Sequence, residues 1–198
     1  MEHRFELRRL SGTSPFQTRE ENGKIYICGY FAVYNSIYNI GHGLSESIAP
    51  GAFDETITDD IRGLVNHDTT LVLGRTTVGT LTLRLDEKGL YGEIEINQAD
   101  SDAMNLYSRV KRGDVSQCSF GFEILEEDTE YREDGSIHWT LKKVKLYEVS
   151  VCTFPAYEDT TVEARRKDAE NIKKRNIEAA KASLKKRMEA LSDGTRTD

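Results

Sequence analysis

The sequence predicts a mainly β fold with flanking helices, of the α+β class. Two observations predict it. Across the first two thirds of the 198 residues, short apolar runs alternate with polar residues between turn-forming ones, which is typical of half-buried strands. From residue 164 onward the composition changes abruptly to Ala, Lys, Arg, Glu and Asn, which are tolerated in a helix. The chain is long enough for one compact core with a terminal appendage.

Seven segments have the pattern of strands in an antiparallel barrel or sandwich. They are residues 5–10, 24–34, 63–67, 80–85, 90–96, 115–125 and 138–151. Residues 86–89 and 133–135 both end in Gly and supply hairpin turns. The pattern therefore predicts an antiparallel β domain over the first part of the chain.

A helix is expected over residues 101–112, because apolar side chains recur there at near-helical spacing. These side chains are Met104, Leu106, Tyr107 and Val110. Asp100 or Ser101 can cap the start of this helix, and Gly113 can end it. A second, short helix is expected over residues 54–61.

Charge is unevenly distributed along the chain. The net charge is −7, but residues 164–191 hold ten Lys or Arg against four acidic residues, a net of +6 that leaves −13 for the remainder. A strongly acidic body argues against a nucleic-acid groove, because phosphate binding needs a basic surface. We therefore divide the chain into a β domain, residues 1–160, and a basic helical tail, residues 161–198.

The basic tail carries one narrow apolar stripe. Its members follow a 3,4,4,3 spacing and are Ile177, Ala180, Leu184, Met188 and Leu191. Two interpretations stay open. The tail is a solvated helix, frayed or disordered, because isolated helices are marginal in water. Alternatively, it binds an acidic partner.

Three cysteines, Cys28, Cys118 and Cys152, are an odd number without any CxxC spacing. They therefore suggest neither a disulfide framework nor a zinc site, and buried thiols are expected. The sequence has no N-terminal apolar segment of signal length and no run of 18 apolar residues. This pattern predicts a cytosolic chain that is not anchored in a membrane.

Three strand-like runs each carry one reactive polar side chain, namely His67, Ser119 and Glu148. A serine hydroxyl needs a neighbouring base to take its proton, and a neutral imidazole suits that task. A carboxylate that accepts the other ring N–H fixes the tautomer and stabilises the imidazolium. Strand alternation directs the Ser119 hydroxyl away from Phe120 and Phe122, which are expected in the core. The three side chains are the inventory of a serine hydrolase.

Each of these residues also has a structural interpretation. A lone serine in a strand is usually not catalytic, and Glu148 can be an acid on an edge strand. Asn66 and Asp68, on either side of His67, suit a turn. Asp68 is a poor orienter for the ring, because sequence neighbours on a strand point in opposite directions.

Two further groups bear on the chemistry. Cys118 and Cys152 are alternative nucleophiles, although strand parity places Cys118 on the face opposite Ser119 and favours its burial. The turn at residues 74–76 is a candidate source of backbone amides for an oxyanion. Its Arg75 side chain is expected to hold a structural carboxylate rather than an acidic substrate residue.

Four segments, taken in order, resemble the tailed-phage prohead maturation proteases. They are residues 46–56 with their Pro-Gly-Ala-Phe run, Asn66-His67-Asp68 followed by residues 73–76, Ser119-Phe120-Gly121-Phe122, and Glu148-Val149-Ser150 followed by Phe154-Pro155-Ala156-Tyr157. The likeness covers residues 29–157. The Pro-Gly-Ala-Phe and Phe-Pro-Ala-Tyr runs are expected to fix turns and bury their aromatic rings.

The resemblance implies a serine endopeptidase with an antiparallel β-barrel of the herpesvirus-assemblin-like type. It implies Ser119 as nucleophile, His67 as general base and Glu148 as the group that orients His67. His138 is a rival third member, since herpesvirus relatives use a second histidine. The implied substrates are the scaffold, the scaffolding segment of the major capsid protein, and the protease itself, without a metal or cofactor.

The implied location is the assembling procapsid in the host cytoplasm. A homodimer is expected from the herpesvirus analogy, and neither nucleic acid nor a membrane is expected as a partner. The alternative is a non-catalytic capsid assembly protein of the same fold, in which Ser119 and His67 lie too far apart to react.

Overall fold

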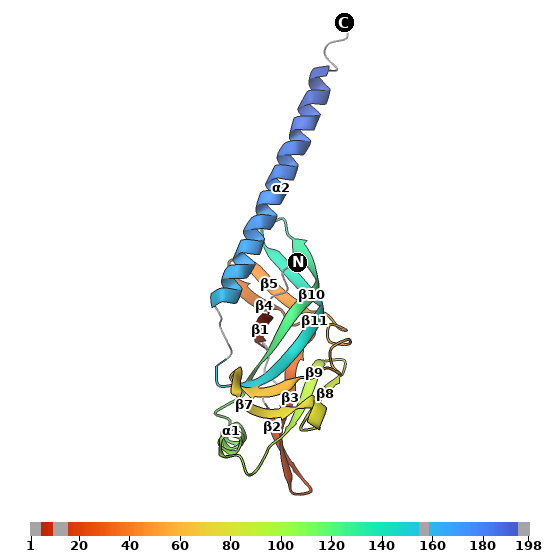
Figure 1. Cartoon of the computed structure of the whole chain (residues 1–198). Coiled ribbons are helices and arrows are strands. Elements are labelled where there is room, and N and C mark those ends of the chain that lie inside the picture. The colour runs from red at the N-terminus through yellow and green to blue at the C-terminus, as the bar shows by residue number, and fades with distance from the viewer. Residues whose placement is uncertain (1–4, 10–15, 155–158, 194–198) are drawn as a thin grey trace. The chain divides into compact units, whose positions relative to one another are not determined.

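The computed structural model describes residues 5–9, 16–154 and 159–193 (Figure 1). The chain separates into two compact units, Met1–Glu158 and Asp159–Asp198. The described residues form a mostly β protein with two α-helices, which confirms the predicted α+β class.

The larger sheet is organised around two long strands that Figure 1 shows side by side. In order, it contains β1 (Phe5–Arg9), β10 (Gln117–Tyr131), β11 (Ile137–Cys152), β5 (Leu44–Ile48) and β4 (Tyr38–Gly41), and β11 also pairs with β6 (Arg62–Val65), which pairs with β7 (Asp68–Arg75). β5 and β6 run parallel to β11, while the pairs β1–β10, β10–β11, β4–β5 and β6–β7 are antiparallel. The prediction of antiparallel pairing is therefore wrong for β5 and β6 against β11. β11 therefore pairs with three other strands of this sheet, β10, β5 and β6.

The smaller sheet is antiparallel throughout. Its strands, in order, are β2 (Gln17–Glu21), β3 (Lys24–Val33), β9 (Gly89–Glu95) and β8 (Leu81–Leu85). A 3₁₀ turn, η1 (Thr76–Val78), connects β7 to β8. The turn at residues 86–89 closes the β8–β9 hairpin as predicted, because the Asp86 carboxylate accepts from the N–H groups of Lys88 and Gly89.

All seven predicted strand segments contain a strand, but four strands were not predicted. These are β2, β4, β5 and β7. β2 has the sequence Gln-Thr-Arg-Glu-Glu and β5 has Leu-Ser-Glu-Ser-Ile, so neither shows a regular apolar alternation. Pairing with β3 and β11, rather than local preference, makes them strands.

The hydrophobic core contains the apolar side chains of both sheets and of α1 (Ser101–Arg112). α1 has the predicted bounds: the Asp100 carboxylate accepts from the N–H groups of Asp102 and Ala103, and Gly113 ends the helix with φ of 89°. Tyr107 of this helix donates its hydroxyl to Glu20 of β2 at 3.1 Å. Its apolar face thus packs on the smaller sheet.

The predicted short helix over residues 54–61 is wrong. Residues 50–58 form successive turns, with the N–H of Asp54 bonded to the Gly51 carbonyl and that of Thr56 to the Phe53 carbonyl. The N–H of Ile57 bonds to the Phe53 carbonyl across four residues, but this bond does not extend into the repeated ladder of an α-helix. As predicted, the Pro-Gly-Ala-Phe run forms a turn, and Phe53 is fully buried in the core.

The second unit is the helix α2 (Asp159–Asp193), which includes the predicted helical segment. Its described residues from Glu170 to Glu189 are almost all exposed, including the stripe members Ile177, Leu184 and Met188. Residues 194–198 of the predicted tail lie outside the described residues. No helix in the described part of the chain is long and apolar enough to span a membrane.

Candidate active site

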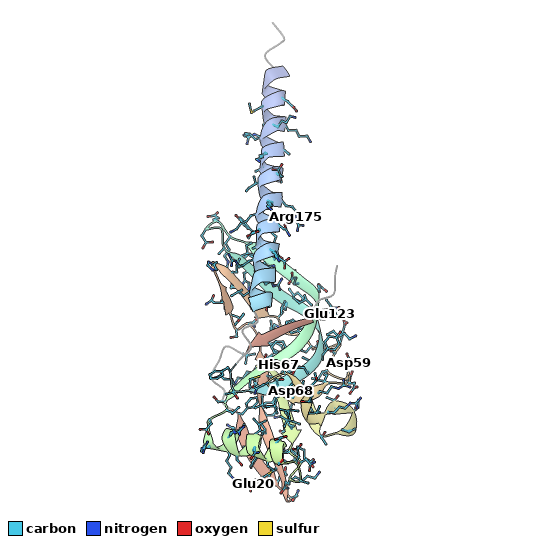
Figure 2. The ribbon with its side chains drawn as sticks, turned by 60° about the vertical axis from the view of Figure 1, so that its left-hand side comes forward. Glu20, Asp59, His67, Asp68, Glu123 and Arg175 are labelled. Atoms are coloured by element: carbon cyan, nitrogen blue, oxygen red, sulfur yellow. The ribbon has the colours of Figure 1, made fainter. Side chains whose placement is uncertain are left out.

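His67 lies in a tight turn between β6 and β7, beside Asp68 in Figure 2. Val65 pairs with Asp68 across the hairpin, and the two residues between them have positive φ angles, 50° at Asn66 and 61° at His67. This is the geometry of a type I′ turn. The predicted strand over residues 63–67 therefore ends at Val65, and the argument against Asp68 from strand alternation does not apply.

Backbone contacts fix the turn against the end of β11. β6 runs parallel to β11 with Leu64 opposite Ser150, and the N–H of Asn66 continues the pairing by donating to the Val151 carbonyl at 3.1 Å. The Asn66 side chain accepts from the N–H of Thr153 at 2.9 Å. The position of the imidazole is thus set by the sheet rather than by a free loop.

The His67 ring is hydrogen-bonded to Glu148 of β11. Nδ1 of His67 and Oε1 of Glu148 are 2.7 Å apart, and the two side chains are only 15% and 7% exposed. A carboxylate can only accept, so Nδ1 carries the proton and Nε2 of a neutral ring carries the lone pair. This tautomer is the one that a general base needs.

Ser150 is a polar residue of the site that the sequence analysis did not single out. Its hydroxyl donates to Oε2 of Glu148 at 2.6 Å and accepts from the backbone N–H of His67 at 3.2 Å. Ser150 is fully buried, and through these two bonds it contacts both members of the His67–Glu148 pair. Its position two residues after Glu148 is the feature of the sequence that could have identified Ser150 as part of the site.

A β-bulge in β11 aims Glu148 at this site. Phe122 of β10 pairs with Leu146, but the preceding Gly121 pairs with Glu148, so Tyr147 is the extra residue. Leu146 points into the core, as do Val149 and residue 151. Regular strand alternation predicts that Leu146 and Glu148 share a face, and this expectation is wrong here because the bulge reverses the alternation between them.

Ser119 lies directly opposite Ser150 in the β10–β11 pair. Directly opposite residues of an antiparallel pair share a face, so the Ser119 side chain is on the face that carries Glu148 and Ser150. Ser119 has no exposed surface. Phe120 and Phe122 lie on the opposite face in the core, as predicted, with ring centroids 5.0 Å apart.

Cys28, Cys118 and Cys152 are buried thiols, as predicted. Sγ of Cys152 is 4.0 Å from Nε2 of His67, but burial, together with the charge of Glu148, raises the pKa of this thiol to about 12. Cys118 donates to the Tyr30 carbonyl at 3.2 Å on the core side of β10. A neutral thiol is a weak nucleophile, so this arrangement does not favour the cysteine alternative.

His138, the rival third member, has other partners. Its two ring nitrogens are each 2.8 Å from a hydroxyl, Nδ1 from Ser45 and Nε2 from Ser47. Burial, helped by the charge of Arg132, lowers the pKa of His138. The structure therefore pairs His67 with Glu148, while His138 bridges two residues of β5.

A sequence profile decides the family of the chain. The profile of the caudovirus prohead serine protease family matches residues 14–175. The chain belongs to this family. The prohead protease of Enterobacteria phage HK97 is 31% identical over 142 residues, 70% of this chain and 60% of the relative. The prohead protease of Escherichia phage T5 is 35% identical over 98 residues, 50% of this chain and 42% of the relative.

The chain thus spans about 60% and 42% of the lengths of these two prohead proteases. Among solved structures, it is similar to the capsid assembly protease gp21 of bacteriophage T4, with a TM-score of 0.48 and 11% identity. That likeness covers 78% of this chain and all of the T4 chain.

The turn after β7 does not offer free amides for an oxyanion in this prohead protease family member. The N–H of Arg75 donates to the Thr80 hydroxyl and that of Thr76 to the Ile61 carbonyl, both at 3.0 Å. The Arg75 guanidinium makes two hydrogen bonds of 2.6 Å to Asp60 and lowers the pKa of that carboxyl to about 2. The structural role predicted for Arg75 is confirmed.

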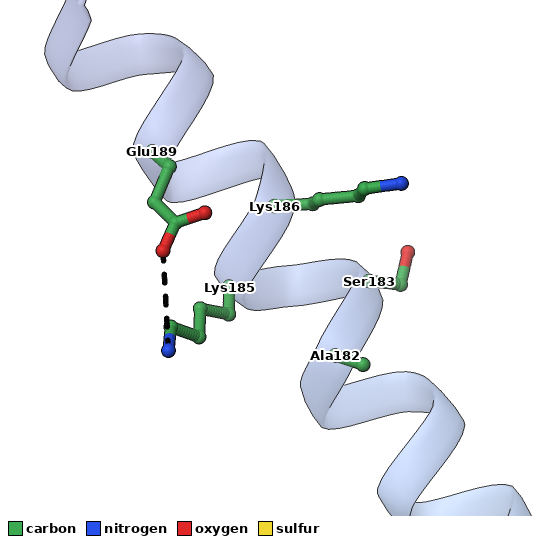
Figure 3. A pocket seen from close by; sticks show the side chains of 5 residues that line it. All are labelled: Ala182, Ser183, Lys185, Lys186 and Glu189. Atoms are coloured by element: carbon green, nitrogen blue, oxygen red, sulfur yellow. Dashed lines mark ion pairs between the residues drawn. The ribbon is translucent and has the colours of Figure 1, made fainter.

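A shallow hollow on α2 is unrelated to this chemistry. Figure 3 shows its lining residues, which are Ala182, Ser183, Lys185, Lys186 and Glu189. All five residues lie on consecutive turns of the same helix, and Lys185 forms an ion pair with Glu189 at 4.0 Å. Among the residues that the structure describes, no group of three or more His, Cys, Asp or Glu side chains is arranged to hold a metal ion.

Proposed function

We propose that the chain is a serine endopeptidase of prohead maturation that uses Ser119, His67 and Glu148. The observation that carries the proposal is the 2.7 Å hydrogen bond between Nδ1 of His67 and Glu148, on the sheet face that Ser119 shares. Membership of the prohead serine protease family supports the same assignment.

In the first half of the reaction, Nε2 of His67 takes the proton of the Ser119 hydroxyl as Oγ attacks the peptide carbonyl carbon. Glu148 stabilises the imidazolium that forms and keeps the ring in one orientation. Collapse of the tetrahedral intermediate breaks the C–N bond, and His67 gives its proton to the departing amine. An acyl ester on Ser119 remains.

In the second half, water replaces the departed amine. His67 removes a proton from the water as its oxygen attacks the ester carbonyl. Collapse then breaks the bond to Oγ, and the proton returns to Ser119. No atom or electron has to come from a metal or cofactor in this sequence.

The proposed substrates are the scaffold, the scaffolding segment of the major capsid protein, and the protease chain itself. The relatives named prohead protease support this choice, and the proposed place of action is the interior of the procapsid. Closure of the two sheets into an assemblin-like barrel, the homodimer and the separate roles of residues 1–160 and 161–198 stay predictions.

The experiment is coexpression of the chain with its cognate capsid protein and scaffold. Ser119→Ala is expected to keep the fold but abolish trimming, because it removes the attacking oxygen. The matched control is Ser47→Ala, which removes a hydroxyl of similar burial that also contacts a histidine ring. Trimming is measured by the shift of the capsid protein on a denaturing gel.

Three outcomes oppose the proposal. Normal trimming by the folded Ser119→Ala variant overturns the assignment of Ser119. If the folded Ser47→Ala variant loses trimming while Ser119→Ala keeps it, the reaction is assigned to the cluster around His138 instead. If neither variant nor the unaltered chain trims the capsid protein, the non-catalytic assembly role is favoured instead.

A further inference from the structure

The outer edge of β10 is occupied by the first strand of the chain. β1 pairs antiparallel with β10 over five positions, from Phe5 opposite Glu123 to Arg9 opposite Ser119. β1 ends the strand order of the larger sheet and has β10 as its neighbour there. The backbone of the N-terminal segment therefore runs along the strand that carries the proposed nucleophile.

An endopeptidase has to hold its substrate in an extended form beside the nucleophile. A free strand edge does this well, because its backbone N–H and C=O groups bind any extended peptide and pockets then select side chains. The outer edge of β10 is the one that reaches Ser119, since β11 covers the inner edge. With β1 in place, the backbone groups of this edge are already paired.

Two further observations set β1 apart from the rest of the domain. The match to the prohead serine protease family begins at residue 14, after β1 has ended. Ser119 has no exposed surface in this structure, so an incoming peptide cannot reach the hydroxyl in this state. An edge strand can detach without unfolding the remaining domain.

Resting on the proposed function, we propose that the outer edge of β10 is the docking site for the extended substrate peptide and that β1 occupies it in the uncleaved chain. The direction of β1 also assigns the polarity of the substrate. Arg9, at the C-terminal end of β1, is the residue opposite Ser119. The substrate residues that precede the scissile bond therefore pair with the stretch from Phe120 to Glu123.

The test is the rate at which a fluorophosphonate labels Ser119 in the purified full-length chain. In one variant, residues 5–9 are replaced by an equal number of Gly and Ser residues, so that the length is kept and the pairing is weakened. Labelling is expected to rise about tenfold, the factor that corresponds to 1.4 kcal/mol of strand docking. Adding a synthetic peptide of residues 1–12 should reverse the increase.

A proline pair sharpens the test. In an edge strand, alternate residues direct their N–H toward the neighbouring strand and toward solvent. Of Leu7→Pro and Arg8→Pro, one should therefore accelerate labelling and the other should not. Thr18→Pro and Arg19→Pro, in the edge strand β2 of the other sheet, are the controls and should leave the rate unchanged.

The outcomes separate this inference from the proposed function. Labelling that depends on Ser119 but is equally fast with and without β1 overturns the inference and leaves the endopeptidase assignment standing. Failure of the peptide to slow labelling of the Gly-Ser variant also overturns it. Absence of labelling in every variant overturns it as well, and capsid trimming then decides whether the proposed function fails too.

Discussion

His67 occupies a backbone conformation that its residue type seldom adopts. Both turn residues have positive φ angles, 50° and 61°, and the second position of a type I′ turn strongly favours Gly. A non-Gly residue there costs about 1–3 kcal/mol, which the surrounding structure must offset. The bond to Glu148 and the contacts of Asn66 supply that compensation. An imidazole at a glycine position is the kind of local conflict expected at a functional site.

At the residue scale, Ser150→Ala is expected to lower kcat/KM about tenfold to a hundredfold. The change removes a hydrogen bond to the Glu148 carboxylate, and bonds to charged groups contribute about 1.5–3 kcal/mol. Peptide hydrolysis kinetics provide the measurement, with the loss expected in kcat rather than KM because Ser150 is not proposed to contact the substrate.

The control for Ser150 is Ser45→Ala, which removes a serine hydroxyl bonded to the other histidine, His138. Ser45→Ala should leave kcat within about twofold. It should lower the free energy of unfolding by about 1 kcal/mol. Equal effects of Ser150→Ala and Ser45→Ala on kcat would show that Ser150 contributes to general stability alone.

At the element scale, one extra residue in β11 decides which face carries the polar cluster. Before the bulge, Leu146 faces the core, and after it Val149 faces the core. In a regular strand Leu146 and Glu148 would share a face, and the carboxylate would then point into the core. The bulge at Tyr147 therefore places Glu148, Ser150 and Cys152 on the side of His67.

Deleting Tyr147 is expected to abolish activity and to destabilise the domain severely. Without the extra residue, the regular alternation directs Glu148 toward apolar side chains, and an unpaired buried carboxylate is among the largest penalties in a core. Urea unfolding and peptide hydrolysis measure the two effects. Tyr147→Ala, which keeps the residue count, is the control and should stay within about 1 kcal/mol of the parent. Retention of the parental rate after the deletion would refute this role of the bulge.

The sequence predicted elements well where local signals suffice. α1 begins and ends as predicted because its caps and apolar spacing are local. The bulge and the type I′ turn were not predicted, since both depend on which residue pairs with which across the sheet. The same holds for Ser150, which the fold brings next to His67 although 83 positions separate the two residues in the sequence. The short helix over residues 54–61 failed because its backbone groups serve successive turns.

At the scale of the whole molecule, the acidic body and the basic helix are two units with opposite charge. The described part of α2 exposes Ile177, Leu184 and Met188 by 54%, 58% and 62%, alongside the ten basic residues of the segment. An exposed apolar stripe between basic side chains suits an acidic partner with an apolar surface. We therefore retain the partner-binding interpretation of the tail.

Deleting residues 164–198 is expected to block packaging of the protease into proheads while leaving hydrolysis of a short peptide unchanged. The protease content of purified proheads is measured on a denaturing gel. Replacing Lys173, Lys174 and Arg175 by Gln should weaken packaging in part, and more so at higher salt, because screening reduces the attraction between exposed charges. Replacing Ile177, Leu184 and Met188 by Ala tests the apolar contribution separately. Full packaging of the deletion variant would remove the tail from this role.

β11 pairs with β10, β5 and β6, and it carries both partners that hold the imidazole in place. A single strand thus joins the chemistry to the largest part of the hydrogen-bonded framework. We therefore expect heat or denaturant to remove the His67–Glu148 arrangement together with the fold of the domain rather than gradually. Residual activity in a stressed sample therefore counts intact molecules rather than reporting partly damaged ones.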